Sequence, residues 1–470
     1  MSRNLRDCNV ASGVGSLKRP GLSRITLFGA LPGAPRMPEQ PLEEVISESA
    51  FADLVGQEAE MFHRLANTLL ARTEPWSRQQ FFQLISEADA LEALLDDHGA
   101  RHNRSYNYLR ELVASLRGLA LAGFSLSHLE HRLDGYPTVL KASEIAQASA
   151  AVRTSRSFLE RALHGLLAAA FAESHKRGIT ISAEFYPESR NGARGPKRIL
   201  PRNMGQEDLE TDDQKVAEMA SRFVTASALF DELGVRRIDD PDERETWLQR
   251  FCTEERARVL ESTVHNLQSA YDTWVKGTAL EASDERLPVL RGQASAALHF
   301  LEAVTHLTHF VERHESGMRN EDSERRIGSL VKRADVREIT LCNLLSWASE
   351  FMRRGRPVAE ELLPAYTDVR ELEVELPDEL YLHARPCALI VGIVNRYATP
   401  VEMVVEGRKC NASSILELMI AVGSHPDARR FRFRGDVHPL RDIELLFRCG
   451  LGERGVHVLP DALAYLRAGG

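Results

Sequence analysis

His383-Ala384-Arg385-Pro386 is the stretch that decides how the C-terminal part of this chain is interpreted. Pro386 suits the first position of a helix, because its missing N–H would have no partner there and its φ is already near helical. The residues before it then lie at the positive end of the helix macrodipole, among backbone N–H groups without an intrahelical acceptor. A histidine in that place can carry a phosphoryl group, and Arg385 adds a planar cation for the phosphate oxygens. The four residues therefore predict a phosphate site at the start of a helix.

The residues around this stretch alternate between strand and helix patterns. Apolar and acidic residues alternate over 371–376, which predicts a half-buried strand. Further strands are predicted at 401–405, 409–412 and 430–434, and helices from Pro386 to about Arg396, from near Ser414, and from about Pro439 to Arg448. The order β-α-β-β-α-β-α is typical of an α+β sandwich with helices on one face of a four-stranded sheet.

This segment, about residues 370–455, resembles HPr, the histidine phosphocarrier of the bacterial phosphoenolpyruvate-dependent phosphotransferase system. The resemblance rests on the strand order and on three motifs: Leu382-His383-Ala384-Arg385-Pro386, Glu406-Gly407-Arg408, and Ser414-Ile415-Leu416-Glu417-Leu418-Met419. It implies a small open-faced β-sandwich in which His383 receives a phosphoryl group from a phosphohistidine donor protein, Enzyme I in that system. His383 would then pass the group to an acceptor protein, which the sequence does not identify. Arg385 takes the place of the arginine that steadies the phosphohistidine.

Ser414 has two interpretations. By the same resemblance it takes the place of a serine that a regulatory kinase modifies in some bacteria, while Ile415, Leu416 and Met419 fall where the family exposes an apolar patch for its partners. Ser414 also precedes Glu417 by three residues, the pattern of a capping box, whose loss would cost about 0.5–2 kcal/mol. Both interpretations stay open at this point.

The segment also departs from the family. Tyr381 stands where a glycine is usual, and Gly392 and Asn395 replace lysines that help some members to dock on acidic Enzyme I. We therefore expect weaker attraction to the usual donor. An alternative hypothesis makes His383 a polar residue at a helix start, in a non-catalytic interaction protein with a degenerate HPr-like docking domain.

The chain before this segment has a helical pattern nearly throughout. We expect a flexible leader at 1–42, a large all-α domain at 43–368 that is divisible into two subdomains at a loop over 185–213, the HPr-like domain at 369–456, and an extension at 457–470. Two stripes of apolar residues recur at helical spacing and indicate a bundle: Leu260, Val264, Leu267, Tyr271 and Trp274, and Leu290, Ala294, Ala297, Leu301 and Val304 after Pro288. The all-α domain would supply or receive a signal, so the chain is interpreted as regulatory.

Composition limits the possible partners and the compartment. The 470 residues carry a net charge of −9, which argues against nucleic acid as the main partner. No apolar run approaches the length of a bilayer span, and Ile25-Thr26-Leu27-Phe28 is too short for a signal peptide. Six dispersed cysteines without a CxxC pair predict a reduced, cytoplasmic protein. Cys387 is interpreted as a packing residue, with oxidation as the alternative.

Histidines gather in one part of the helical region: His299, His306, His309 and His314, with Glu302 nearby. Glu60 and His63 form a single Glu-x-x-His pair, whereas a carboxylate-bridged di-metal site in a helical bundle needs that motif twice. We therefore predict surface or core histidines, no metal and no cofactor. A metal-dependent helical enzyme remains a third hypothesis, and the chain is expected to be a phosphoryl carrier rather than an independent enzyme.

Overall fold

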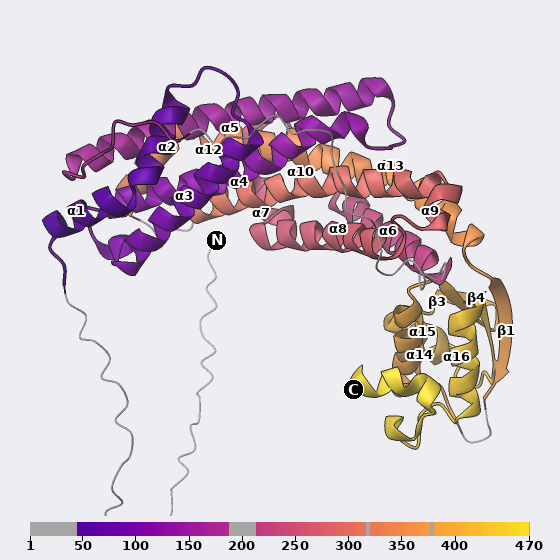
Figure 1. Ribbon diagram of the computed structural model, residues 1–470. Coiled ribbons are helices and arrows are strands. Elements are labelled where there is room, and N and C mark those ends of the chain that lie inside the picture. Colours follow the sequence, from indigo (N-terminus) through magenta and orange to yellow (C-terminus); the bar gives the residue numbers. More distant parts are fainter. Residues whose placement is uncertain (1–44, 188–212, 316–319, 377–379, 470) are drawn as a thin grey trace, which may run out of the picture. The chain divides into compact units, whose positions relative to one another are not determined.

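The computed structural model describes residues 45–187, 213–315, 320–376 and 380–469 (Figure 1). The leader predicted at 1–42, most of the loop predicted at 185–213, and the strand break predicted at Pro377 and Asp378 lie outside the described residues.

The described chain from Glu48 to Leu362 is helical. Its helices are α1 Glu48–Glu58, α2 Glu60–Leu70, α3 Arg78–Asp97, α4 Asn107–Arg132, α5 Ala142–Lys176, α6 Asp213–Leu233, α7 Pro241–Phe251, α8 Glu254–Trp274, α9 Ala279–Ser283, α10 Arg286–Glu315, α11 Glu321–Leu330, α12 Arg333–Glu338 and α13 Ser346–Leu362. A π-helical stretch, Ile339–Leu345, joins α12 to α13, and short 3₁₀ turns lie at Ala100–His102, Leu133–Gly135 and Leu363–Ala365.

A first hydrophobic core joins these helices. Helix α4 packs against α3, α5 and α10, and α10 packs in turn against α8 and α13 (Figure 1). The second predicted stripe is buried along α10, and the first is buried along α8 except for Trp274. Trp274 is half exposed at the end of α8, and the Nζ of Lys215 lies 5.3 Å from its ring centroid.

Helix α4 corrects one expectation from the sequence. Residues Asn107–Gly135 form a helical stretch long and apolar enough to cross a membrane by length and composition, although no run of that kind was expected. The charged residues near its start interrupt the apolar pattern in the sequence, but the 18-residue window beyond them is apolar. Of that window 67% is buried among other helices, as in the core helix of a soluble protein, so it is weak evidence for a membrane span.

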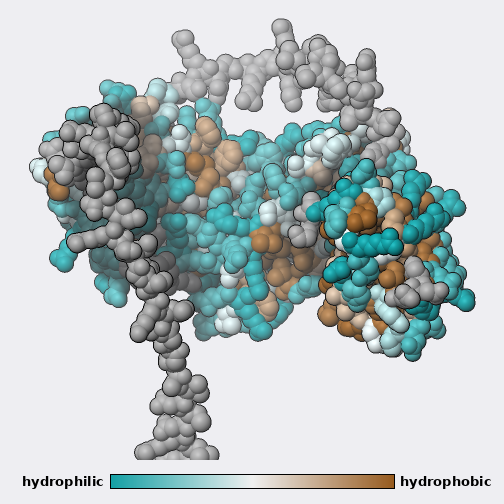
Figure 2. Space-filling view, turned by 90° about the horizontal axis from the view of Figure 1, so that it is seen from below, coloured by the Kyte–Doolittle hydropathy of each residue, from teal (hydrophilic) through white to brown (hydrophobic). Residues whose placement is uncertain are grey.

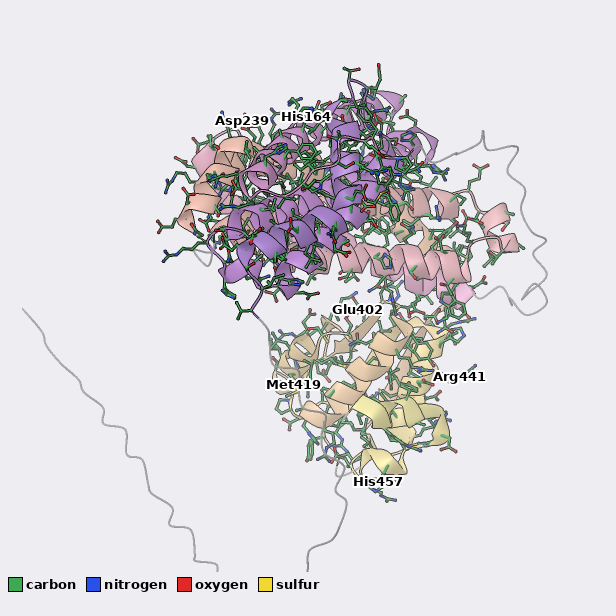
Figure 3. All side chains as sticks on the ribbon, turned by 60° about the vertical axis from the view of Figure 1, so that its left-hand side comes forward. His164, Asp239, Glu402, Met419, Arg441 and His457 are labelled. Atoms are coloured by element: carbon green, nitrogen blue, oxygen red, sulfur yellow. The ribbon has the colours of Figure 1, made fainter. Side chains whose placement is uncertain are left out.

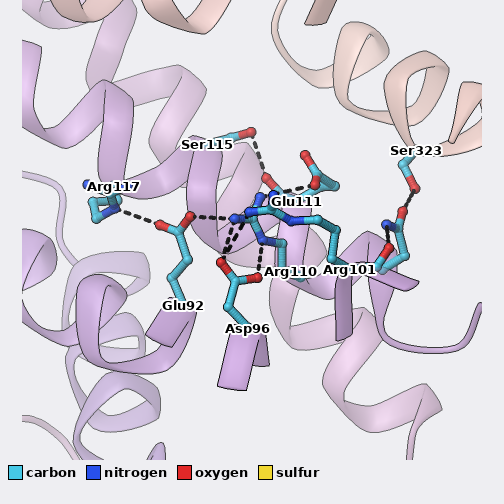
Figure 4. A network of polar contacts seen from close by, with 9 residues as sticks. Glu92, Asp96, Arg101, Arg110, Glu111, Ser115, Arg117 and Ser323 are labelled. Carbon is cyan, nitrogen blue, oxygen red and sulfur yellow. Dashed lines mark hydrogen bonds and ion pairs between the residues drawn. The ribbon is translucent and has the colours of Figure 1, made fainter. Parts of the chain in front are cut away.

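The N-terminal half of α4 carries a buried polar network (Figure 4). The Arg110 guanidinium is almost fully buried and donates to Asp96, Glu92 and Glu111, with the shortest distances to the two Asp96 oxygens at 2.7 and 2.8 Å. Arg117 donates to the second oxygen of Glu92 at 2.6 Å. A buried carboxylate needs such hydrogen-bond donors to replace the water that it loses. Because the carboxylates of Glu92 and Asp96 lie on α3 and the arginines on α4, the network joins the two helices.

The C-terminal part has its own hydrophobic core and a four-stranded sheet. Its elements follow in the order β1 Val369–Glu375, α14 Ala384–Tyr397, β2 Val401–Val405, β3 Arg408–Asn411, α15 Ile415–Gly423, β4 Arg430–Asp436 and α16 Val437–Arg448. All three strand pairings are antiparallel and the spatial order is β1-β4-β2-β3. The predicted class, a large all-α region followed by a small α+β region, is thus confirmed.

Buried and exposed residues alternate along the strands, and the buried residues mark the face of the sheet that packs against the helices. Val374 of β1 faces Phe431 of β4, and Met403 of β2 faces Phe433; all four side chains are buried in the second core. The intervening positions are charged and exposed, as in the pairs Glu373–Arg432 and Glu375–Arg430. Glu406 and Gly407 both have positive φ, which gives a tight turn between β2 and β3.

The residues after α16 belong to this second core. Two 3₁₀ segments, Val456–Val458 and Asp461–Gly469, follow it, and Leu459, Leu463 and Leu466 are buried in the core. A Cβ added to Gly392 of α14 would lie 3.0 Å from Cδ2 of Leu466. The stretch predicted as an extension therefore packs on α14, and Gly392 leaves room for it.

Candidate functional site

His383 caps the N-terminus of α14. Its backbone is extended, with φ −134° and ψ −168°, and its carbonyl accepts the first helical hydrogen bond from the N–H of Cys387 at 3.1 Å. The helix therefore begins at Ala384, and Pro386 lies at its third position, not at its first as predicted. Proline is tolerated there for the same reason, because the N–H groups of the first turn have no intrahelical acceptor.

The imidazole and the guanidinium of this motif are both accessible. The side chains of His383 and Arg385 are 50% and 58% exposed, whereas Pro386 and Cys387 beside them are buried. The backbone N–H groups of Ala384 and Arg385 belong to the first turn of a 14-residue helix. An anion bound there would meet these N–H groups, the positive end of the helix dipole and the Arg385 fork.

Glu453 contacts both residues of the motif. Its Oε1 lies 2.8 Å from Nε2 of His383, and its Oε2 lies 3.7 Å from Nη1 of Arg385. The sequence analysis did not find this residue, because nothing in the local pattern around Glu453 distinguishes it from other surface acids. The structure thus adds a third member to the candidate site.

The contact with Glu453 determines which imidazole nitrogen is available. An ionised carboxylate only accepts hydrogen bonds, so Nε2 of His383 must carry the proton that is donated to it. In the neutral ring the other nitrogen, Nδ1, then holds the lone pair. Nδ1 is therefore the nitrogen that can act as a nucleophile.

A tight loop after α16 holds Glu453 in place. Gly450, Leu451 and Gly452 all have positive φ, a conformation that is unfavourable for leucine. Leu451 adopts it with its side chain fully buried in the second core. A Cβ added to Gly452 would lie 2.6 Å from Cδ1 of Leu389 on α14, so this glycine allows the loop to approach that helix closely.

Ser414 is the N-cap of α15. Its hydroxyl accepts from the N–H of Glu417 at 3.3 Å, which is one half of the predicted capping box. The other half differs from the prediction, because the Glu417 carboxylate accepts from the N–H of Asn411 at 2.9 Å. The two residues thus fix both the helix start and the end of β3.

Helix α15 exposes an apolar patch. The residues predicted for partner binding are exposed on it, with Leu416 the most exposed at 67%, and Ile420 extends the patch by one turn. Figure 2 shows hydrophobic side chains on the surface of the C-terminal part, and Met419 is labelled there in Figure 3. Large exposed apolar residues gathered in this way are typical of an interaction surface.

Other predicted residues take ordinary structural roles. Tyr381 is exposed, with the Arg429 guanidinium 5.8 Å from its ring centroid. Cys387 is fully buried, and burial raises the pKa of its thiol to about 11, so it carries no thiolate at neutral pH. The five cysteines in the described ranges are all free thiols.

Several histidines of the helical part contact acids or other rings. His299 contacts Glu302 at 2.9 Å and packs against the ring of His128, while His309 contacts Glu254 at 2.7 Å. His63 is buried beside Phe171. Within the described ranges no three metal-ligating side chains come together as a group that could hold a metal ion.

Comparison with known families gives a match within the C-terminal region. Residues 370–427 match the family model described as the PTS HPr component phosphorylation site, and the helical region matches no family. No curated protein and no solved structure matches the chain. The predicted resemblance to HPr is therefore confirmed over residues 370–427, a range that includes His383, Arg385 and Ser414 but ends before Glu453.

Proposed function

We propose that His383 is a phosphoacceptor, in an HPr-like domain that is fused to a helical signalling or interaction domain. The matched family makes this region phosphocarrier-like. One observation carries the assignment of the residue: His383 is exposed at the start of α14 while its Nε2 is bonded to Glu453. This arrangement offers Nδ1 as a nucleophile beside a helix N-terminus and a guanidinium.

The transfer would exchange one phosphorus–nitrogen bond for another. Nδ1 of His383 attacks the phosphorus of a donor phosphohistidine in line with the leaving nitrogen, and the donor imidazole departs with the electron pair of the broken bond. The His383 ring then becomes a cation, since Nε2 keeps its proton. The Glu453 carboxylate stabilises that cation, and Arg385 with the first-turn N–H groups stabilises the phosphoryl oxygens.

The partners would be a phosphohistidine donor of the Enzyme I kind and a protein acceptor. Helix α15 packs against α14, so its exposed apolar patch lies on a helix next to the site. This patch supports docking of such proteins there. Leu466 occupies the surface of α14 at Gly392, where some family members carry a lysine. Docking here would therefore depend more on apolar contact than on attraction between opposite charges. A cytoplasmic, bacterial setting and a regulatory role for the helical domain belong to the same proposal.

Phosphoryl transfer to the full-length chain tests the proposal. Enzyme I and labelled phosphoenolpyruvate are expected to place one acid-labile label on the protein. His383→Ala should remove that label, while His457→Ala, which changes an exposed histidine elsewhere in the C-terminal part, should keep it. Absence of label on His383 with every phosphohistidine donor would refute the phosphoacceptor assignment.

The alternative is a docking protein without phosphoryl transfer, which the exposed patch on α15 equally supports. His383→Ala and the unmodified chain separate the two functions. If binding to a partner survives in His383→Ala and no label is found in the unmodified chain, the C-terminal domain acts by docking alone.

A further inference from the structure

A cavity of about 270 Å³ lies between helices α4, α8 and α10, within the helical part of the chain. Helix α10 packs against both α4 and α8. None of the residues proposed above for phosphoryl transfer lines this cavity. It is therefore a separate feature, and the sequence analysis did not predict it.

The described residues that line the cavity include five basic side chains and no carboxylate: Arg117, Arg258, Arg313, His306 and His309. Acids that do not line the cavity contact some of these groups. Glu92 and Asp89 both approach Nε of Arg117, at 2.6 and 3.6 Å, so neither of these contacts uses its Nη groups. Glu92 is also shared with Arg110 (Figure 4).

Glu254 holds two of the other basic groups. Its Oε1 accepts from Nε and Nη2 of Arg258, and its Oε2 lies 2.7 Å from Nδ1 of His309. These contacts leave Nη1 of Arg258 and Nε2 of His309 outside the pairing. An acid that binds one side of a guanidinium orients its remaining N–H donors, as outer groups do around a ligand site.

His306 belongs to the α10 wall of the cavity. The pKa of His306 is lowered to about 4, chiefly by burial; Glu302 opposes this shift, and Arg258, His309 and Arg117 add to it. The ring is therefore neutral at pH 7 and can donate one N–H. The lining thus combines three arginines, of which Arg258 and Arg313 are exposed, with the more buried ring of His306.

Gly118 leaves one wall of the cavity open. It lies inside helix α4, where glycine is less favourable than alanine, yet a Cβ added to it would meet no atom within 4 Å. Close packing of another helix therefore does not require this glycine. A side chain at this position would instead extend into the cavity.

We propose that this cavity binds a phosphate group, free or carried on a small molecule. Planar guanidinium groups from different helices match the several oxygens of a phosphate, and the neutral His306 can add an N–H. The volume lies below the roughly 300–1,000 Å³ typical of sites for drug-sized ligands, which restricts the occupant to a small anion. The helical part would thus sense a small phosphorylated compound, a role independent of phosphoryl transfer on His383.

Calorimetric titration of the full-length protein tests this site with three probes: inorganic phosphate, pyrophosphate and glycerol 3-phosphate. At least one should bind with a dissociation constant below about 1 mM. Tightest binding of inorganic phosphate would identify a free-phosphate site, and tightest binding of the ester would identify a phosphorylated small molecule. No binding of any probe up to 10 mM, a concentration on the order of ten times that limit, would overturn the proposal.

Variants locate the binding. Arg258→Gln should weaken the affinity for the bound probe about tenfold or more, since a charge-assisted hydrogen bond is lost. Gly118→Leu fills the cavity without changing the charge and should abolish binding while the helical circular dichroism remains. Arg441→Gln, at an exposed arginine of the C-terminal part (Figure 3), and His383→Ala should leave the affinity unchanged. Unchanged affinity in Gly118→Leu, or its loss in His383→Ala, would refute this location.

Discussion

Nε2 of His383 lies 2.8 Å from Oε1 of Glu453, although the two residues are 70 positions apart in the chain. The histidine caps α14, and the glutamate lies in the loop that follows α16. This one contact sets the tautomer of the candidate phosphoacceptor and links it to Arg385 through the second oxygen of the same carboxylate.

Glu453→Ala should slow phosphorylation of His383. The hydrogen bond that fixes Nε2–H would be lost, and because both side chains are partly exposed we expect an effect of about 1 kcal/mol, or roughly fivefold in rate. Phosphoryl transfer from Enzyme I measures the rate, and ¹⁵N shifts of the His383 ring measure the tautomer. Glu444→Ala is the matched control, since Glu444 pairs with Arg448 on the surface of α16. An unchanged tautomer in Glu453→Ala would contradict the positioning role.

Ser414→Ala should destabilise the protein by about 1 kcal/mol, because the N–H of Glu417 loses its cap. Ser414→Asp should retain most of the stability, since aspartate caps a helix as well as serine does. Urea unfolding of the C-terminal transition gives both values. Ser413→Ala, at a neighbouring serine whose hydroxyl donates to the Asn411 side chain and not to a helix end, serves as the control. Equal stability of Ser414→Ala and the unmodified protein would exclude the capping role.

Gly392 and Leu466 should be energetically coupled. Alanine in a helix is about 1 kcal/mol more favourable than glycine, but the added Cβ would lie 3.0 Å from Cδ2 of Leu466. Gly392→Ala alone should therefore gain less than this amount, whereas in a Leu466→Ala background it should gain nearly all of it. A double-mutant cycle by urea unfolding measures a coupling of about 0.5–1 kcal/mol. Strict additivity would show that the C-terminal segment does not pack on α14 in solution.

Arg110→Met should destabilise the helical part strongly, by about 3–5 kcal/mol. It removes the shared partner of three carboxylates, of which Glu92 and Glu111 are nearly fully buried. Arg101→Met is the control, because Arg101 is exposed and lies 3.4 Å from Asp96, so its loss should cost under about 1 kcal/mol. Thermal unfolding, followed by circular dichroism, compares the stability of the two variants. Similar losses of stability would contradict the argument that the burial of Arg110 makes its ion pairs important.

Stability should fall in mild acid because of His63. Burial lowers the pKa of His63 from 6.5 to about 4, so the unfolded chain binds a proton on this residue more readily than the folded chain. The contribution of neutral His63 to the unfolding free energy is fully present above about pH 6.5 and is lost as the pH falls toward 4. The total loss is about 3 kcal/mol. His63→Leu should reduce the slope of the unfolding free energy against pH between 6.5 and 4, and part of the slope should remain because burial also lowers the pKa of His306 and His128 to about 4. An identical slope in the variant would mean that His63 is accessible to protons in the folded state.

Local patterns predicted most of the elements correctly. The alternation at 401–405 became β2, and the stripe from Leu290 to Val304 became the buried face of α10, because both depend only on the period of the backbone. The incorrect predictions concern the ends of helices and the partners of side chains. Helix α14 starts two residues before the predicted position, and the Glu417 carboxylate caps a strand end instead of its own helix.

The sequence by itself determined the two-part organisation of helices followed by an α+β segment, and it singled out His383 and Arg385. Those features follow from periodicity and from a motif of adjacent residues. Only the tertiary structure brought Glu453 to His383, Leu466 to Gly392, and the arginines of three helices around one cavity. Each of these contacts joins residues far apart in the chain, and which distant side chains meet is decided by how the helices pack, which no local spacing encodes.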